Sequence, residues 1–282
     1  MQPLELYIHI PFCVKKCAYC DFLSGPAGEK EKEEYVKMLV DEIRNCPDTV
    51  QNYRVISIFF GGGTPSLLTG EQIGRLMDTV REIFTLDEDA EITMEMNPGT
   101  VTEEKLRKYR QAGVNRLSIG LQSVNDEELR LLGRIHTYEE FREAYHLARA
   151  NGFSNINVDL ISAIPGQTVE SWRRTLEQVM ALSPEHISAY SLILEEGTTF
   201  YKKYVEDEAK EGPKLPDEDA ERQMYWDTET LMEKNGYHRY EISNYAKEGY
   251  ACRHNLGYWE RIPYLGFGIG AASLVPGDLI GK

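Results

Sequence analysis

The stretch "LYIHIPFCVKKCAYCDF", residues 6–22, holds three of the five cysteines of the chain. A short apolar run typical of a β-strand comes first, and Cys13, Cys17 and Cys20 follow it on a loop. Cysteines clustered this closely indicate a metal or redox site rather than disulfides wherever thiols stay reduced. A structural zinc site wants four ligands, and the nearby candidate, His9, lies on the strand itself. Three thiolates suit a [4Fe–4S] cluster with one iron left open for a substrate or cofactor.

The composition is that of an ordinary soluble globular protein, with 282 residues, 41% hydrophobic and 27% charged. No run approaches the ~18 apolar residues of a membrane span, and the first residues do not form a signal peptide. We therefore expect a cytoplasmic protein that is not an integral membrane protein. The formal net charge of −15 argues against nucleic acid as a partner, because such binding needs a basic face.

Strand and helix patterns alternate six times along the first two thirds of the chain. The expected strands cover residues 6–10, 55–60, 91–96, 116–120, 156–161 and 186–194. The expected helices cover residues 29–45, 71–84, a segment capped by Thr102, the region up to Ala150, and 169–182. This alternation predicts an α/β fold with a parallel sheet. Six units are too few for a closed eight-stranded barrel, so we expect a partial (β/α)6 TIM-like barrel with its chemistry at the carboxyl ends of the strands.

The alternation stops after Leu194. Residues 206–219 are highly charged and predict an exposed loop or lid, residues 217–235 predict a helix, and "GYHRYEISNY", residues 236–245, predicts one further strand. We therefore divide the chain into a partial-barrel core, residues 1–205, and a C-terminal α+β extension, residues 206–282.

The motif CxxxCxxC after the first strand of a partial barrel resembles the radical S-adenosylmethionine (SAM) superfamily. Other motifs are similar to the oxygen-independent coproporphyrinogen III oxidase-like family, and most of all to its haem-chaperone branch. They are "GGGTPS", "EMNPGT", "GLQS", "LLGRIH", "VDLISAIPGQT", "EEGT" and "HNLGYW". The resemblance implies a [4Fe–4S] cluster whose open iron chelates SAM and which, once reduced, cleaves it to a 5′-deoxyadenosyl radical.

The same resemblance implies a set of SAM-binding residues at the carboxyl ends of the strands. They are Tyr7, Phe22, Gly62, Gly63, Thr64, Glu95, Gln122, Arg134 and Asp159. Structural alternatives stay open for several of them. The glycines could form a tight turn, Glu95 could make an ion pair on the rim, and Asp159 could hold a neighbouring loop. Tyr7 and Phe22 could each be packing residues.

Phe22 distinguishes two branches of the family. The oxidase branch has a fourth cysteine two residues after the third, and here that place is Phe22, as in the chaperone branch. The resemblance therefore implies a haem chaperone that binds haem and delivers it to an acceptor haemoprotein, such as a membrane respiratory enzyme. The alternative is an oxygen-independent coproporphyrinogen III oxidase, an enzyme that decarboxylates a porphyrin precursor. Whether SAM is cleaved productively stays open.

The motif "HNLGYW", residues 254–259, is associated with haem in the chaperone branch. His254 is therefore a candidate axial ligand for haem iron and Cys252 a thiolate alternative, whereas a structural His254 would hold the extension to the barrel. Arg253 or Arg261 could bind the haem propionates. Two departures from the branch are expected to matter: Ala272 replaces a histidine, and the family's small C-terminal domain is absent from a chain that ends at Lys282.

Overall fold

Six parallel strands lie side by side in chain order and form the centre of the molecule. The computed structural model describes residues 1–207 and 211–279. The strands are β1 (Gln2–Ile10), β2 (Tyr53–Gly62), β3 (Thr85–Met96), β4 (Arg116–Gln122), β5 (Ile156–Ser162) and β6 (His186–Ser191). Each pairs in parallel with the next. The predicted partial barrel is confirmed, although the sixth strand ends at Ser191 and not at Leu194.

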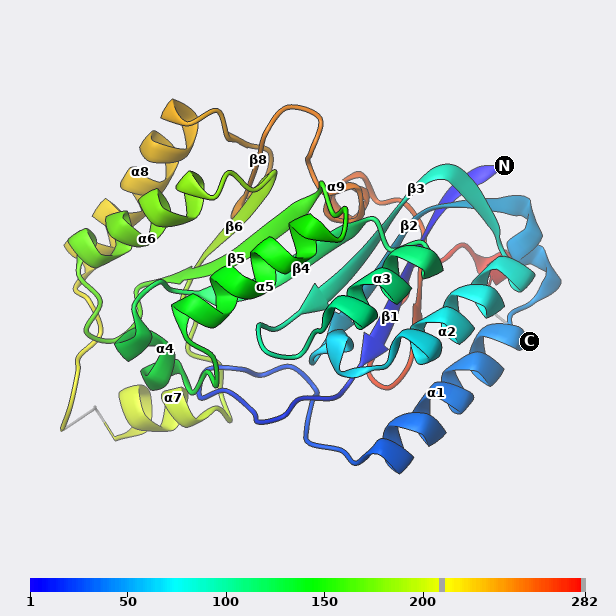
Figure 1. Cartoon of the computed structure of the whole chain (residues 1–282), viewed down its shortest axis with the longest axis horizontal. Coiled ribbons are helices and arrows are strands. Elements are labelled where there is room, and N and C mark those ends of the chain that lie inside the picture. The colour runs from blue at the N-terminus through cyan, green and yellow to red at the C-terminus, as the bar shows by residue number, and fades with distance from the viewer. Residues whose placement is uncertain (208–210, 280–282) are drawn as a thin grey trace.

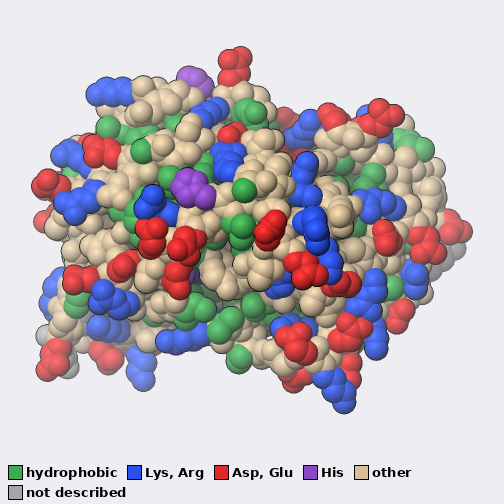
Figure 2. Space-filling model, viewed as in Figure 1, with side chains coloured by type: hydrophobic (Ala, Val, Ile, Leu, Met, Phe, Trp, Pro, Cys, Tyr) green, Lys and Arg blue, Asp and Glu red, His purple; other side chains and the backbone are tan. Residues whose placement is uncertain are grey.

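Helices cover one face of this sheet (Figure 1). They are α1 (Glu29–Arg44), α2 (Gly70–Ile83), α3 (Glu103–Ala112), α4 (Asp126–Leu132), α5 (Tyr138–Ala150) and α6 (Val169–Ala181). Thr102 caps α3 as predicted, because its side chain accepts a hydrogen bond from the Lys105 N–H. Shorter helical turns cover Asp48–Asn52, Pro65–Leu67, α7 (Thr199–Tyr201), Lys202–Glu206 and Gly277–Leu279. Acidic and basic side chains are interspersed over the outside of the helix layer (Figure 2).

The two faces of the sheet differ in chemistry because side chains alternate along each strand. The face toward the helices is apolar and buried, with Leu4, Leu6, Ile8, Ile58, Phe60, Ile92, Met94, Leu117, Ile119, Val158 and Leu160. The opposite, inner face is polar or aromatic, with Glu5, Tyr7, His9, Ser57, Phe59, Glu91, Thr93, Glu95, Arg116, Ser118, Asn157, Asp159, His186 and Ser188. Stability of the sheet thus comes from the helix side, and the inner side is left for polar chemistry.

The extension adds strands to both edges of the core sheet. It contains α8 (Glu218–Lys234), β7 (His238–Arg239), β8 (Asn244–Ala246), α9 (Arg253–Glu260) and β9 (Tyr264–Phe267). The single strand predicted over residues 236–245 is wrong: β7 and β8 form a short hairpin, and β8 pairs antiparallel with β6. At the far edge β9 pairs in parallel with β1, which gives the strand order β7-β8-β6-β5-β4-β3-β2-β1-β9.

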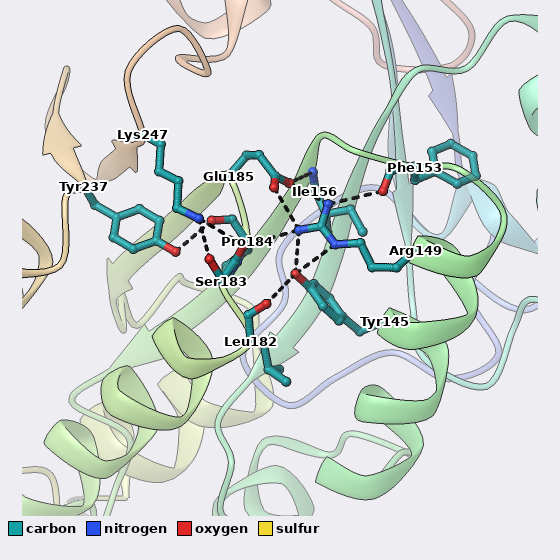
Figure 3. A network of polar contacts seen from close by, with 10 residues as sticks. All are labelled: Tyr145, Arg149, Phe153, Ile156, Leu182, Ser183, Pro184, Glu185, Tyr237 and Lys247. Atoms are coloured by element: carbon teal, nitrogen blue, oxygen red, sulfur yellow. Dashed lines mark hydrogen bonds and ion pairs between the residues drawn. The ribbon is translucent and has the colours of Figure 1, made fainter.

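A polar cluster near the start of β6 ties α5, the α6–β6 turn and the extension together (Figure 3). Arg149 of α5 donates hydrogen bonds to Tyr145 Oη at 2.6 Å and to Glu185 Oε1 at 3.0 Å. From the extension, Lys247 donates to Ser183 Oγ at 2.6 Å. The extension is therefore fixed to the core by directed polar contacts as well as by strand pairing.

Replacing Arg149 with methionine keeps most of the aliphatic stem but removes the donor to Tyr145 Oη and the cation beside Glu185, which keeps its hydrogen bond from the Ile156 N–H. We expect a loss of about 2–3 kcal/mol in the free energy of unfolding, because the pair is mostly shielded from water. That corresponds to a melting temperature roughly 5–10 °C lower. Thermal unfolding followed by circular dichroism measures it. The control is Arg142→Met on the same helix, whose exposed pair with Glu139 contributes well under about 1 kcal/mol. Equal effects of the two changes would contradict the account.

Candidate functional site

The cysteine loop lies at the carboxyl end of β1, between β1 and α1, and both of its flanks are anchored. The Cys13 N–H donates to Gly25 O at 2.9 Å, and the Ala18 N–H donates to Leu132 O at the end of α4, also at 2.9 Å. Cys13, Cys17 and Cys20 are free thiols, each partly exposed. Burial raises the pKa of Cys20, so its thiolate needs a metal or a nearby cation to form.

The glycines after β2 are required by the packing of the cysteine loop. A methyl group on Gly62, whose φ is +109°, would lie 2.5 Å from the ring of His9. A methyl group on Gly63 would lie 2.7 Å from the carbonyl oxygen of Phe12. The ring of His9 in turn hydrogen-bonds Leu23 O, at the end of the cysteine loop, at 2.9 Å. The two glycines therefore pack against the cysteine loop, directly and through His9.

Thr64, Asn97 and Arg134 link the glycine turn to the cysteines. Thr64 Oγ1 lies 3.6 Å from Cys13 Sγ and accepts a hydrogen bond from Asn97 Nδ2 at 2.8 Å. Arg134 donates to Asn97 Oδ1 at 2.6 Å and to Gly120 O at 2.7 Å, and its Nη1 lies 3.8 Å from Cys17 Sγ. Its Nε is buried and, among the described residues, has no partner. These side chains help line a cavity of about 20 Å³ beside Cys17.

Two carboxylates, Glu95 and Asp159, enter the same region from β3 and β5. Glu95 accepts a hydrogen bond from the Gly62 N–H at 3.2 Å, and within the described part of the chain no ion pair to a cation is recorded for either acid. Burial, with the charge of Asp159 added, raises the pKa of Glu95 to about 8. Burial also raises the pKa of Asp159, but hydrogen bonds from Ser118 and Asn157 and the charge of Arg116 oppose the rise. The two acids are interior and lie close enough for the charge of Asp159 to act on Glu95, and the charge of Arg116 acts on Asp159.

The other residues predicted for SAM lie around this region with different exposure. Tyr7 points into the inner face and its hydroxyl contacts His9 Nδ1 at 3.2 Å. Gln122 is buried at the end of β4 in a left-handed conformation with φ of +77°, which is uncommon for a residue other than glycine. Phe22 is 67% exposed at the end of the cysteine loop, so it does not pack in the core.

The haem-ligand candidates lie elsewhere, against the amino-terminal half of the inner face. His254 is buried; its Nδ1 lies 2.8 Å from Ser57 Oγ and its Nε2 lies 3.1 Å from Tyr258 Oη. Burial lowers the pKa of His254 to about 3. Cys252 is fully buried against Glu91, and burial raises the pKa of its thiol to about 12. These are the contacts of the structural alternative, in which His254 holds the extension to the barrel, and neither side chain is open to a haem iron in this conformation.

Comparison with known proteins identifies the relatives of this site. The model of the Radical SAM superfamily matches residues 7–179. Heme chaperone HemW of Escherichia coli (strain K12) is 44% identical over 272 residues, which cover 96% of this chain and 70% of that protein. The chain belongs to the HemW family of the radical SAM superfamily. HemW of Bacillus subtilis (strain 168) is 39% identical over 96% of this chain and 71% of its own length.

A solved structure agrees with this membership. The coproporphyrinogen III oxidase HemN of Escherichia coli, described as a radical SAM enzyme, superimposes with a TM-score of 0.84 at 29% identity. The match covers 97% of this chain and 65% of HemN, so the chain spans less than two thirds of that protein. Membership of the radical SAM superfamily implies a [4Fe–4S] cluster and SAM. Among the helices of the described residues, none is long and apolar enough to cross a membrane.

From the sequence, His9 is only a candidate zinc ligand and Asn97 and Asn157 have no predicted role, yet all three organise the site of this radical SAM protein. His9 holds the cysteine loop, Asn97 joins Thr64 to Arg134, and Asn157 holds Asp159. Each stands on, or directly after, a strand at a position that faces the polar inner side. The alternation of polar and apolar residues along β1, β3 and β5 was the available signal, because a polar residue facing inward in an apolar strand needs a partner.

Proposed function

We propose that this chain is a haem chaperone of the HemW type, which holds a [4Fe–4S] cluster on Cys13, Cys17 and Cys20 and SAM beside it. It would bind haem and pass it to an acceptor haemoprotein, such as a membrane respiratory enzyme. The observation that carries the proposal is the meeting of the three thiols with Thr64 and Arg134 at one rim, in a chain 44% identical to a heme chaperone over 96% of its length.

The residues at the rim fit both cofactors. Three thiols without a fourth ligand suit a cluster, in which each thiolate binds a different iron, better than a single ion. SAM is a cation with an α-carboxylate. The carboxylates of Glu95 and Asp159 suit its positive charge, and the buried Nε of Arg134, which has no partner among the described residues, suits a carboxylate. When bound, these cofactors would supply one-electron chemistry.

SAM affinity is expected to rise with pH between about 6.5 and 8.5. Glu95 has a pKa of about 8, and its ionised form attracts the sulfonium ion better than its neutral form. The stability of the free protein should follow the opposite trend. A carboxyl whose pKa is raised on folding contributes stability that is complete below its unfolded value, and that contribution is lost as the pH rises through about 8. Equilibrium dialysis of reconstituted protein at several pH values measures the affinity.

The matched variants for this pH dependence are Glu95→Gln and Glu5→Gln. Glu5 also has a pKa raised to about 8 by burial, but it lies near His254, away from the cysteine loop. Glu95→Gln should flatten the pH dependence of SAM binding, and Glu5→Gln should leave it unchanged. A flat profile in the unmodified protein, or the same loss in both variants, would contradict the assignment of Glu95 to SAM.

Haem, as the bound cargo, is proposed to contact the outward side of α9. While His254 and Gly257 of this helix point inward, Tyr258 and Trp259 are 41% and 59% exposed. Arg261, directly after the helix, is exposed and could pair with a propionate. A flat apolar macrocycle with two carboxylates suits an exposed aromatic surface beside a cation. The predicted ligation by His254 or Cys252 would require α9 to leave its present position.

Trp259→Ala is therefore expected to weaken haem binding by roughly tenfold, the effect of losing a large aromatic contact. The control is Trp226→Ala on α8, which removes a tryptophan of nearly equal exposure, 55%, from another surface. Haem titration followed by absorption spectroscopy measures both.

His254→Ala should instead lower the melting temperature, because Ser57 and Tyr258 lose their partner. If His254→Ala abolished the haem spectrum at unchanged stability, His254 would be the iron ligand and the α9 surface would not be the site.

The alternative function is oxygen-independent coproporphyrinogen III oxidase. It is favoured by the TM-score of 0.84 with HemN. Phe22 and the higher identity with HemW proteins favour the chaperone. Turnover of coproporphyrinogen III by the reconstituted protein with SAM would establish the oxidase.

A further inference from the structure

Both oxygens of the Asp159 carboxylate accept hydrogen bonds, one from the neighbouring strand β4 and one from its own strand β5. Ser118 Oγ of β4 donates to Asp159 Oδ2 at 2.9 Å, and Asn157 Nδ2 of β5 donates to Asp159 Oδ1 at 2.8 Å. Asn157 Nδ2 also donates to Ser118 Oγ at 2.7 Å. The carboxylate is therefore fixed in orientation before any ligand arrives, and Asn157 supplies much of that constraint.

The other end of the Asn157 amide is held by a buried histidine. His186 Nδ1 lies 2.6 Å from Asn157 Oδ1, and His186 Nε2 lies 2.8 Å from Tyr240 Oη. An amide oxygen can only accept a hydrogen bond, so Nδ1 of His186 must carry the proton. Nε2 then accepts from the Tyr240 hydroxyl. Burial keeps the pKa of His186 well below its usual value, which agrees with a neutral ring that donates on one side and accepts on the other.

The chain of hydrogen bonds begins in the extension, at the start of α9. Tyr240 Oη accepts from the backbone N–H of Cys252, the N-cap of α9, and from Asn255 Nδ2, both at 3.3 Å. Its own proton is thus free to point to His186. Every donor along the path points the same way, from α9 through Tyr240, His186 and Asn157 to Asp159. Hydrogen bonds aligned in one direction polarise one another, and they favour negative charge at the accepting end.

We propose that Asn157, His186 and Tyr240 are positioning residues of the SAM site, which fix the orientation and the negative charge of Asp159 from the extension. This inference rests on the proposed SAM site and adds a function for the extension within it. It also gives the two acids different roles. Asp159, supplied with donors, is the permanent anion, and Glu95, which has a single backbone donor, is the acid whose charge changes when the ligand binds.

The charged and titratable groups that face Asp159 agree with this division. Arg116 of β4, which is buried, lowers the pKa of Asp159, and Asp159 in turn raises the pKa of Glu95. Tyr190 of β6 also faces Asp159, and partial burial together with the charge of Asp159 raises the pKa of its hydroxyl, which a tyrosine in any case keeps protonated at neutral pH. We call the hydrogen-bond chain from Tyr240 through His186 to Asn157 the relay. Arg116 and the relay both favour the ionised form of Asp159, whereas no described cation faces Glu95 in the same way.

Tyr240→Phe tests the relay with the smallest change. Without the hydroxyl, Nε2 of His186 loses the hydrogen bond that it accepts from Tyr240, and the polarisation that this bond passes on through Asn157 to Asp159 is lost. The titration midpoint of Asp159, followed by infrared difference spectroscopy with ¹³C-labelled aspartate, should rise by roughly half a pH unit. Asn157→Ala should raise it further. The control is Tyr237→Phe, which removes another tyrosine hydroxyl, bonded to Pro184 O at 2.7 Å and outside the relay.

SAM affinity of the reconstituted protein is the second measurement. Tyr240→Phe should weaken SAM binding by roughly fivefold, and Tyr237→Phe should not, even if both lower the melting temperature equally. The proposal is overturned if Tyr240→Phe and Asn157→Ala behave like the control Tyr237→Phe. In that case both the titration midpoint of Asp159 and the affinity for SAM would be the same in all three variants. If the unmodified protein binds no SAM while the midpoint shifts as expected, the relay stands and the SAM assignment is what fails.

Discussion

Replacing Cys13, Cys17 or Cys20 singly with alanine is expected to reduce bound iron from about four atoms per chain to nearly none after anaerobic reconstitution. Each of these thiolates would bind a different iron, and the loop offers no further thiol: the place of a fourth cysteine is Phe22, and His9 is bonded to Leu23 O at 2.9 Å. Iron and sulfide analysis and the visible absorption of the cluster measure the loss. SAM binding should disappear with the cluster.

The control for this prediction is Cys46→Ala. Cys46 lies just after α1 and, like the three loop cysteines, is a partly exposed free thiol, but it does not belong to the loop. It should leave the iron content unchanged. If the alanine variants of Cys13, Cys17 and Cys20 all kept about four irons, the cluster would have to lie elsewhere.

Gly62→Ala is expected to have the second large effect. The new methyl group would lie 2.5 Å from the ring of His9, and alanine would be held at φ of +109°, a region that side-chain-bearing residues avoid. Together these terms should cost roughly 2–5 kcal/mol in the free energy of unfolding. Because His9 holds the cysteine loop, the variant should also assemble less cluster. Urea unfolding and iron analysis measure the two consequences.

Gly74→Ala on α2 is the matched control. A methyl group there meets nothing within 4 Å, and the backbone is helical, so this change should stabilise the protein by about 0.5–1 kcal/mol. A Gly62→Ala variant as stable as the unmodified protein, with a full cluster, would show that the glycine turn and the cysteine loop are not packed as described.

Local signals predicted the core of the fold well. Apolar alternation located the six parallel strands, and Thr102 marked the start of α3 correctly. The same signals brought the three cysteines, Glu95 and Asp159 to one end of the sheet, because the carboxyl ends of parallel strands meet at one edge. The pattern therefore predicted where these side chains lie, whereas their binding of a cluster and SAM stays a prediction that rests on the family resemblance.

The remaining features depend on contacts between distant segments, which local patterns do not report. The pairing of β9 with β1 joins residues more than two hundred positions apart, and nothing in "YLGF" specifies that partner. The buried position of His254 depends on its hydrogen bond with Ser57, which in turn bonds Glu5. Ser57 was predicted only as part of a strand, and Glu5 was not predicted to have any role. The hairpin of β7 and β8 was missed because two strands of two and three residues carry too little alternation to separate.

One parallel assay tests the central claim, a haem chaperone built on a radical SAM site, most directly. Anaerobically reconstituted protein is titrated with haem, and the same preparation is incubated with SAM, reductant and coproporphyrinogen III. We expect about one haem bound per chain at micromolar concentration and no decarboxylated porphyrin product. Decarboxylation of coproporphyrinogen III, or a cluster-loaded protein that binds no haem, would contradict it.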